Sequence, residues 1–300
     1  MRSPLLKPGQ TVGIVVPARK ADEQLLRKGC EVIESWGLRV QFGAHCFHND
    51  NTYLAATDSE RLMDFQSMID NPEIDAIFCA RGGYGTTRIL DQLNFESFVA
   101  KPKWIVGFSD ITALHIKLHQ LGIESIHGSM PTQFSNSAYS DSVDSLKKML
   151  FSPAQNAITV QAAKPNRIGS VKGNVIGGNL SLIVDSLGTS TEINTSGKIL
   201  VVEEVDERLY KIDRMFTQLK RAGKLTDLAG LIVGHFTDLG DTELPFGQLY
   251  EDIILDKISA QSFPVAFGFP IGHQAPNLAW RHGAVASLNV SLEGALLMFD

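Results

Sequence analysis

Apolar and polar residues alternate along the first half of the chain in a pattern that predicts strands followed by helices. Short apolar runs bounded by breakers predict buried strands over residues 11–18, 38–42, 74–80, 104–108 and 123–127. Between these runs, apolar residues recur every three or four positions, which is the spacing of an amphipathic helix. This spacing predicts a helix over residues 25–36, a second that begins after the capping-box signature of residues 57–60, a third that ends near residue 93, and a fourth over 110–121. The alternation predicts a mostly parallel α/β sheet that is covered on both faces.

The second half of the chain has an alternation of its own. Residues 135–167 are rich in Ser, Asn, Asp and Pro around one short helix over 143–150. Beyond them, strands are predicted over 170–176, 198–205 and 231–236, helices over 180–187 and 212–223, further elements over 250–258 and 265–269, and two final strands after residue 284. We therefore expect an N-terminal domain over residues 1–151, a linker over 152–167 and a C-terminal domain over 168–300.

Composition excludes several classes of protein. The chain has 300 residues, of which 44% are hydrophobic and 20% charged, and its formal net charge of −6 argues against nucleic acid or an anionic membrane as a partner. There is no run of about 18 apolar residues and no apolar signal-peptide core, so we expect a cytoplasmic protein. The three cysteines form no C-x-x-C pattern, so we expect no disulfide framework, metal site or cofactor.

Ser109 stands where a predicted strand turns sharply into a predicted helix. The strand over 104–108 ends just before it, and helical spacing begins at Asp110. Such a turn exposes a hydroxyl beside the unpaired N–H groups of a helix start, as in the nucleophile elbow of hydrolases. The second glycine of the G-x-S-x-G motif is missing, however. Ser109 is therefore either a nucleophile or a simple helix cap.

A glycine-rich loop over residues 82–85 follows the strand over 74–80. It lies where a parallel sheet places its ligand, and its N–H groups could bind phosphate, stabilise an oxyanion or merely form a tight turn. His115 and His119 share one helix face and could bind zinc, but Ile116 replaces the glutamate of the catalytic zinc motif. A partly solvated helix face explains these two histidines better.

Two acidic residues and one histidine in the second half complete the candidates. Glu203 and Glu204 interrupt an apolar strand, so either one faces a cleft and is paired, or the strand is ending and both are solvated. His273 lies in a Pro/Gly loop after a strand, where it could transfer a proton or be a surface residue. Ser, Glu and His together supply the three roles of a hydrolytic triad.

Five motifs in this chain resemble those of the LD-carboxypeptidase family, the S66 serine peptidases. They are ARGGYGTTRIL at 80–90, GFSDITAL at 107–114, GGNL at 177–180, EEVDERLYKIDRM at 203–215 and FPIGH at 269–273. They follow the family's order across nearly the whole chain. The resemblance implies a flavodoxin-like N-terminal domain, a smaller α/β C-terminal domain of the swivelling type, a cytoplasmic location and a homodimer.

The resemblance also implies a Ser109–Glu203–His273 triad. The family often has Glu-Asp where this chain has Glu203-Glu204, so Glu204 is the second candidate for the carboxylate, and Leu209 replaces a common proline. We expect the N–H groups of Gly83 and Asp110 to meet the oxyanion. Arg81 and Tyr84 are candidate substrate contacts, Arg81 because a guanidinium binds a carboxylate in a bidentate manner. An exposed salt bridge is the alternative role of Arg81.

The motifs are most similar to the muramoyl-tetrapeptide carboxypeptidase branch of the family. That branch implies a small-peptide substrate, with terminal D-alanine released from murein tetrapeptides during peptidoglycan recycling. A sister branch, the microcin C immunity proteins, cleaves aminoacyl-nucleotide conjugates with the same triad. A metallopeptidase using His115 and His119, a nucleotide-binding module without hydrolytic activity, and a catalytically dead binding protein remain alternatives.

Overall fold

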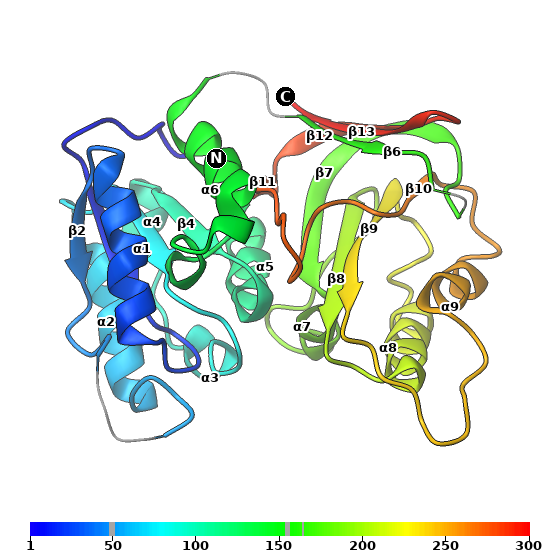
Figure 1. Ribbon diagram of the computed structural model, residues 1–300, viewed down its shortest axis with the longest axis horizontal. Coiled ribbons are helices and arrows are strands. Elements are labelled where there is room, and N and C mark those ends of the chain that lie inside the picture. The colour runs from blue at the N-terminus through cyan, green and yellow to red at the C-terminus, as the bar shows by residue number, and fades with distance from the viewer. Residues whose placement is uncertain (48–51, 154–156, 164) are drawn as a thin grey trace. The chain divides into compact units, whose positions relative to one another are not determined.

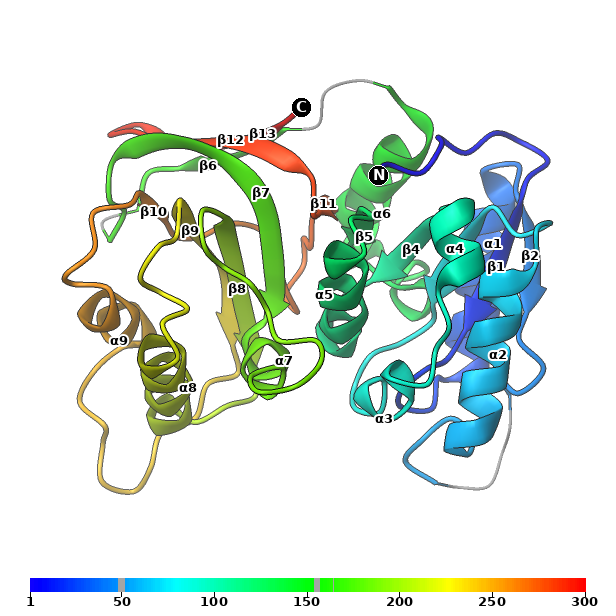
Figure 2. The same cartoon turned by 180° about the vertical axis from the view of Figure 1, so that it is seen from behind.

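The computed structural model describes residues 1–47, 52–153, 157–163 and 165–300. The chain forms two compact units, each built around its own sheet (Figures 1 and 2). The first unit comprises Met1–Ala154 and Pro276–His282, and the second comprises Gln155–Ala275 and Gly283–Asp300. This two-sheet α/β architecture confirms the predicted fold class. Among the described residues, no helix has the length and apolar character that a membrane crossing needs.

The sheet of the first unit has five parallel strands and one antiparallel edge strand. In the order β2-β1-β3-β4-β5-β11 the strands are Arg39–Phe42, Thr11–Val15, Ala76–Cys79, Trp104–Gly107, Ser125–His127 and Trp280–His282. Without β11, this is the 2-1-3-4-5 order of flavodoxin-like sheets, which place their ligands at the carboxyl ends of the strands. The parallel strands are fully or nearly fully buried apart from β2 at the edge, as expected for a sheet covered on both faces.

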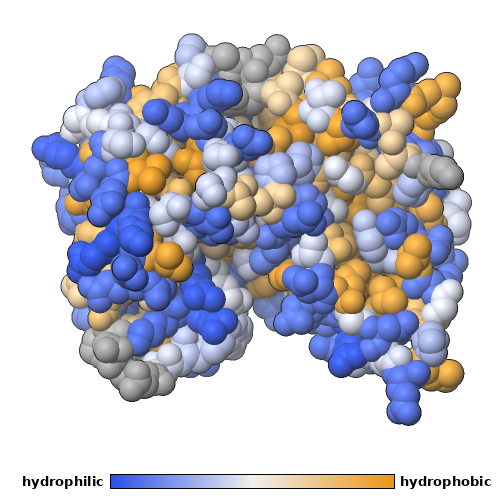
Figure 3. All heavy atoms as spheres, viewed as in Figure 1, coloured by the Kyte–Doolittle hydropathy of each residue, from blue (hydrophilic) through white to orange (hydrophobic). Residues whose placement is uncertain are grey.

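Helices cover both faces of this sheet, as the two views show (Figures 1 and 2). They are α1 (Glu23–Ser35), α2 (Asp58–Asp70), α3 (Thr87–Leu90), α4 (Glu96–Ala100), α5 (Thr112–Gln120) and α6 (Ser140–Phe151). The predicted capping box is confirmed, because Thr57 Oγ1 accepts the Glu60 N–H while the Glu60 carboxylate accepts the Thr57 N–H. The outer face of α1 is mostly hydrophilic (Figure 3), whereas its inner residues Leu26 and Ile33 are fully buried.

The second unit has a mixed seven-stranded sheet. Its order is β10-β9-β8-β7-β12-β13-β6, with bounds Val265–Ala266, Gly230–Thr237, Ile199–Val205, Gly169–Asn179, Val285–Val290, Gly294–Phe299 and Ala157–Gln161. The first four strands are parallel and the last three run antiparallel to their neighbours. The helices of this unit are α7 (Leu180–Asp185), α8 (Leu209–Arg221) and α9 (Tyr250–Lys257).

Three features of the chain path differ from what the sequence pattern indicated. Ala157–Gln161, within the expected linker, forms the edge strand β6 on β13; residues 154–156 and 164 of that stretch lie outside the described residues. Residues 177–179, expected as a turn, are the extended end of β7. Finally, residues 276–282 return to the first unit, where β11 pairs with β5.

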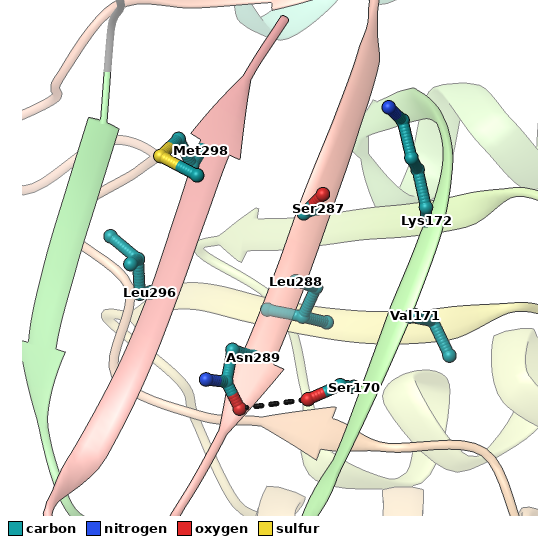
Figure 4. A pocket seen from close by; sticks show the side chains of 8 residues that line it. All are labelled: Ser170, Val171, Lys172, Ser287, Leu288, Asn289, Leu296 and Met298. Carbon is teal, nitrogen blue, oxygen red and sulfur yellow. Dashed lines mark hydrogen bonds between the residues drawn. The ribbon is translucent and has the colours of Figure 1, made fainter.

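The outer face of the antiparallel strands carries a shallow depression. Side chains of β7, β12 and β13 line it, including Ser170, Lys172, Asn289 and Met298 (Figure 4). Ser170 Oγ donates a hydrogen bond to Asn289 Oδ1 at 2.9 Å. The residues that line it include no carboxylate, imidazole or thiol that could serve as a general base beside these serines.

A buried aromatic cluster holds β11 in the first unit. The rings of His115 and His282 stack with centroids 5.4 Å apart, and those of His127 and Trp280 stack at 5.0 Å. The two nitrogens of His115 lie 2.9 Å from Gly107 O and 2.7 Å from Ser125 Oγ. A neutral imidazole satisfies both partners, since one nitrogen donates to the carbonyl and the other accepts from the hydroxyl.

This cluster predicts that the first unit loses stability in acid. Burial lowers the pKa of His115 from 6.5 to about 4, and burial also lowers the pKa of His282. Because the unfolded chain takes up protons first, the stabilisation is complete above pH 6.5 and is lost as the pH falls below it. His115 alone should contribute roughly 2 kcal/mol between about pH 7.5 and 5.

Denaturant unfolding followed across this pH range measures the effect. The variant His282→Phe keeps an aromatic ring but cannot titrate, so its free energy of unfolding should depend less on pH than that of the unmodified chain. An identical pH slope in the two proteins would contradict the assignment.

Candidate active site

Ser109 occupies a strained turn at the carboxyl end of β4. Its φ of +63° is in the left-handed region, which non-glycine residues adopt at a cost of about 1–3 kcal/mol when the surroundings enforce it. A short 3-10 helix (Ser109–Ile111) leads from this turn into α5, and no side chain caps the start of either helix. Phe108 and Ile111, not Ser109, are the N-cap residues of these two helices, and Ser109 lies at a sharp turn from strand to helix.

The glycine loop packs directly against Ser109. A Cβ atom on Gly82 would lie 3.0 Å from Ser109 Cβ, 3.2 Å from Ser109 Oγ and 3.3 Å from the Asp110 nitrogen. A side chain at position 82 would therefore crowd Ser109 and the start of the following helix. The Asp110 carboxylate, 1% exposed, accepts the Thr86 N–H at 2.8 Å and so ties the end of the loop to the turn. Burial raises the pKa of Asp110 in spite of the hydrogen bonds from Thr86.

The other predicted residues of the first unit surround the same loop. Arg81 is half-buried, and its Nη1 donates to Lys20 O at 3.5 Å. Among the described residues, no ion pair includes Arg81, so the alternative of an exposed salt bridge has no support. Tyr84 is 51% exposed and lies near the Arg88 guanidinium, which pairs with Asp58. Gly83, with a φ of +108°, follows Gly82 in the loop.

In the second unit, the structure brings Glu203 and His273 together. Glu203 is fully buried, and its Oε2 lies 2.8 Å from His273 Nδ1. Since a carboxylate can only accept, Nδ1 carries the proton and Nε2 is the basic nitrogen. The side chain of His273 is 21% exposed, so it is not an ordinary surface residue. Burial has the largest influence on the pKa of His273 and lowers it, but the carboxylates of Glu203 and Glu204 outweigh burial and raise the pKa overall.

Glu204 has a different role from Glu203. It is 2% exposed, and its carboxylate accepts hydrogen bonds from Asn179 Nδ2 and from the N–H and hydroxyl of Ser181, at the start of α7. Burial raises the pKa of Glu204. Of the two alternatives drawn from sequence, the idea that both glutamates are solvated is therefore wrong, and Glu203 is the partner of His273.

Sequence reasoning missed the residues that shape the pocket of Glu203. Val202 lies opposite Val233 and Glu204 opposite Phe236, so β9 contains one residue more than β8 at this point, a β-bulge. A Cβ on Gly234 would lie 3.3 Å from Glu203 Cβ, and one on Gly272 would lie 2.8 Å from Glu203 Oε2. His235, in the same bulge, has a pKa lowered by burial, with Glu203 and His273 both acting on it electrostatically. In the sequence, Gly234-His235 interrupts an otherwise apolar strand, and this interruption could have predicted the bulge.

The histidines of α5 do not form a metal site. His115 is fully buried with both nitrogens engaged, so the expectation of a partly solvated helix face was wrong for this residue. Within the described ranges, no cluster of three or more His, Cys, Asp or Glu side chains is placed to hold a metal ion. Cys30, Cys46 and Cys79 are free and buried.

Comparison with known proteins relates these two units to one family. The model of the LD-carboxypeptidase N-terminal domain matches residues 12–128, and that of the C-terminal domain matches residues 172–288. The chain is 37% identical over 299 residues to a probable murein peptide carboxypeptidase of Bacillus subtilis, covering 97% of this chain and 92% of the relative. The crystal structure of muramoyltetrapeptide carboxypeptidase from Oxalobacter formigenes superposes with a TM-score of 0.87 at 28% identity, covering 97% of this chain and 98% of the other.

A more distant relative represents the sister branch. The microcin C7 self-immunity protein MccF of Escherichia coli is 24% identical over 308 residues, covering 90% of this chain and 88% of the relative. At this level of identity the similarity is weaker than that to the two carboxypeptidases.

The Glu203–His273 contact predicts a measurable titration shift. Replacing Glu203 by Gln removes the negative charge beside the imidazole, so the pKa of His273 should fall. Nuclear magnetic resonance of the His273 Cε1 proton measures this directly. Glu204→Gln is the matched control and should lower the pKa less, because Glu204 does not touch the ring. Equal shifts in the two variants would refute the assignment.

A second prediction concerns the space around Glu203. Gly272→Ala should displace the Glu203 carboxylate and weaken its bond to His273, because the new Cβ would lie 2.8 Å from Oε2. Gly268→Ala is the control, since Gly268 also has a positive φ but no atom lies within 4 Å of its added Cβ. Only the substitution at 272 should lower the pKa of His273. A normal His273 titration in Gly272→Ala would show that the pocket tolerates a methyl group.

Proposed function

Because this chain belongs to the LD-carboxypeptidase family, we propose that it is a serine carboxypeptidase that releases the terminal D-alanine of murein tetrapeptides. The observation that carries the proposal is the 2.8 Å contact between the buried Glu203 carboxylate and His273 Nδ1. This contact fixes the tautomer in which Nε2 is basic, as a general base for a serine requires. The strained turn at Ser109, with its glycine loop, supplies the matching nucleophile.

The proposed reaction begins when Ser109 Oγ attacks the carbonyl of the L-centre that precedes D-alanine. His273 Nε2 takes the hydroxyl proton, and Glu203 stabilises the imidazolium that results. The negative oxygen of the tetrahedral intermediate accepts hydrogen bonds from the N–H groups of Asp110 and Gly83. The amide C–N bond then breaks as His273 returns the proton to the leaving D-alanine. His273 then deprotonates a water molecule, which attacks the acyl-enzyme; the bond to Ser109 Oγ breaks, Oγ takes the proton back from His273, and the tripeptide leaves.

This mechanism requires Ser109 Oγ to come within hydrogen-bond reach of His273 Nε2 in the working enzyme. The two residues belong to different units of the chain, so their approach is part of the proposal. We further propose that the enzyme is a cytoplasmic homodimer that acts in peptidoglycan recycling, as the family resemblance implies.

The second candidate function is cleavage of aminoacyl-nucleotide conjugates, as in the branch of the microcin C immunity proteins. The same triad would serve this reaction, and the weaker similarity to MccF makes it the less favoured of the two. Free D-alanine released from a murein tetrapeptide, measured beside hydrolysis of an aminoacyl sulfamoyl nucleoside, distinguishes them. Hydrolysis of the nucleoside alone would overturn our preference.

Substitution of Ser109 should separate activity from stability. Ser109→Ala should reduce kcat by at least about 10⁴-fold, since the nucleophile is lost while the oxyanion donors remain. Ser109→Gly should be equally inactive, yet about 1 kcal/mol more stable than Ser109→Ala, because glycine adopts the positive φ freely. Steady-state kinetics and thermal unfolding of both variants test this pair of effects. An active Ser109→Ala enzyme would exclude Ser109 as the nucleophile.

The pH dependence of kcat/KM should follow the protonation of His273. The base must be neutral to accept a proton, and its pKa in the folded protein is raised above 6.5. The value of kcat/KM should therefore fall on acidification through a pKa above 6.5, and Glu203→Gln should move this acid limb to lower pH. A limb that does not move in Glu203→Gln would assign the titration to another group.

A further inference from the structure

Arg19 lies beside the glycine loop, next to Gly82 and Gly83. It follows β1, and its N–H donates to Gly82 O at 3.3 Å. Its guanidinium lies over the ring of Tyr53, 5.2 Å from the ring centroid. The neighbouring backbone reinforces this arrangement, since the Lys20 N–H donates to Tyr53 O at 3.0 Å. Arg19 and Tyr53 thus form one wall next to the loop.

Two consecutive glycines of the loop, Gly82 and Gly83, approach Ser109 and Arg19, respectively. A Cβ on Gly82 would touch Ser109 Oγ at 3.2 Å, whereas one on the next residue, Gly83, would lie 2.6 Å from Arg19 Cβ and 3.3 Å from the Tyr53 hydroxyl. Consecutive Cα atoms are about 3.8 Å apart. Two consecutive loop residues therefore approach Ser109 and Arg19, at the carboxyl ends of the adjacent strands β1, β3 and β4.

Two positive charges gather at this place in a chain whose net charge is −6. Arg81, at the start of the same loop, has a pKa that burial lowers, and the positive charge of Arg19 lowers it further. Among the described residues, no ion pair neutralises either guanidinium. Asp22 acts on Arg81 electrostatically, but its carboxylate caps α1 by accepting the Leu25 N–H. An anion bound here would relieve the repulsion between the two arginines.

We infer that Arg19, together with Arg81 and supported by Tyr53, binds the free C-terminal carboxylate of the peptide substrate. The inference rests on the proposed carboxypeptidase function and adds Arg19 and Tyr53 as determinants of specificity. In a carboxypeptidase the terminal carboxylate lies one residue beyond the scissile carbonyl, and the loop that passes Ser109 at Gly82 passes Arg19 and Tyr53 at the next residue, Gly83. Two guanidiniums offer several N–H donors in fixed planes, so a carboxylate is favoured over a neutral amide. The stacking on Tyr53 holds the Arg19 plane in position.

Binding to an inactive chain tests the inference without catalysis. In Ser109→Ala, calorimetry compares a murein tetrapeptide ending in D-alanine with the same peptide ending in D-alaninamide. The acid should bind about 10- to 100-fold more tightly than the amide, as expected for charge-assisted hydrogen bonds. Adding Arg19→Gln should remove about tenfold or more of the affinity for the acid and leave that for the amide unchanged. Arg19→Lys should be intermediate, because it keeps the charge but loses the planar fork.

Arg221→Gln is the matched control, since Arg221 is an exposed arginine at the end of α8; it should keep the full preference for the acid. Equal losses for acid and amide in both Arg19 variants, or no loss for either peptide, would overturn the inference. Release of D-alanine by the unmodified chain is measured separately. Absence of release would refute the proposed function, whereas the acid-to-amide preference of Ser109→Ala decides the carboxylate site by itself.

Discussion

The burial of the Glu203 charge is the constraint on which the candidate site of the second unit depends. A carboxylate with no exposed surface is stable only if it is paired, because its desolvation costs several kcal/mol. The pairing with His273 satisfies this requirement at one oxygen. The backbone packs closely around this side chain, since a Cβ on Gly234 in the β9 bulge or on Gly272 in the loop would lie within 3.3 Å of it. The orientation of His273, the loop at Gly272 and the bulge in β9 therefore all meet at this one buried carboxylate.

In the first unit, the corresponding constraint is the strained backbone conformation of Ser109. Ser109 is held in a left-handed conformation because β4, the glycine loop and the buried Asp110 fix both sides of the turn. Asp110 links the loop to the turn through the Thr86 N–H, so the proposed oxyanion donors and the proposed nucleophile are parts of one hydrogen-bonded piece of structure. A turn of this kind stores strain that a purely structural serine would not need. Arg19 and Arg81 lie beside the same glycine loop.

Local patterns predicted much of the fold, and long-range contacts account for what was missed. The parallel sheet of the first unit follows from apolar runs and helical periodicity, and the capping box at Thr57 and Glu60 marked the start of α2. The short strands β6 and β11 could not be predicted, because their partners β13 and β5 are far away in sequence and decide their pairing. Glu203 and Glu204 were both recognised as unusual in an apolar strand, but their different roles depend on His273 and on Asn179 and Ser181. His115 was misjudged because its burial depends on the distant ring of His282.

The return of residues 276–282 to the first unit has a consequence for how the chain can be divided. A fragment ending near residue 153 would contain five parallel strands but not β11, so the edge of β5 would be left open. It would also uncover the histidine face that Trp280 and His282 cover in the whole chain. Open edges beside apolar rings recruit other strands and promote aggregation. The two sheets are therefore not separable as an N-terminal half and a C-terminal half, because this short segment of the second half completes the first sheet.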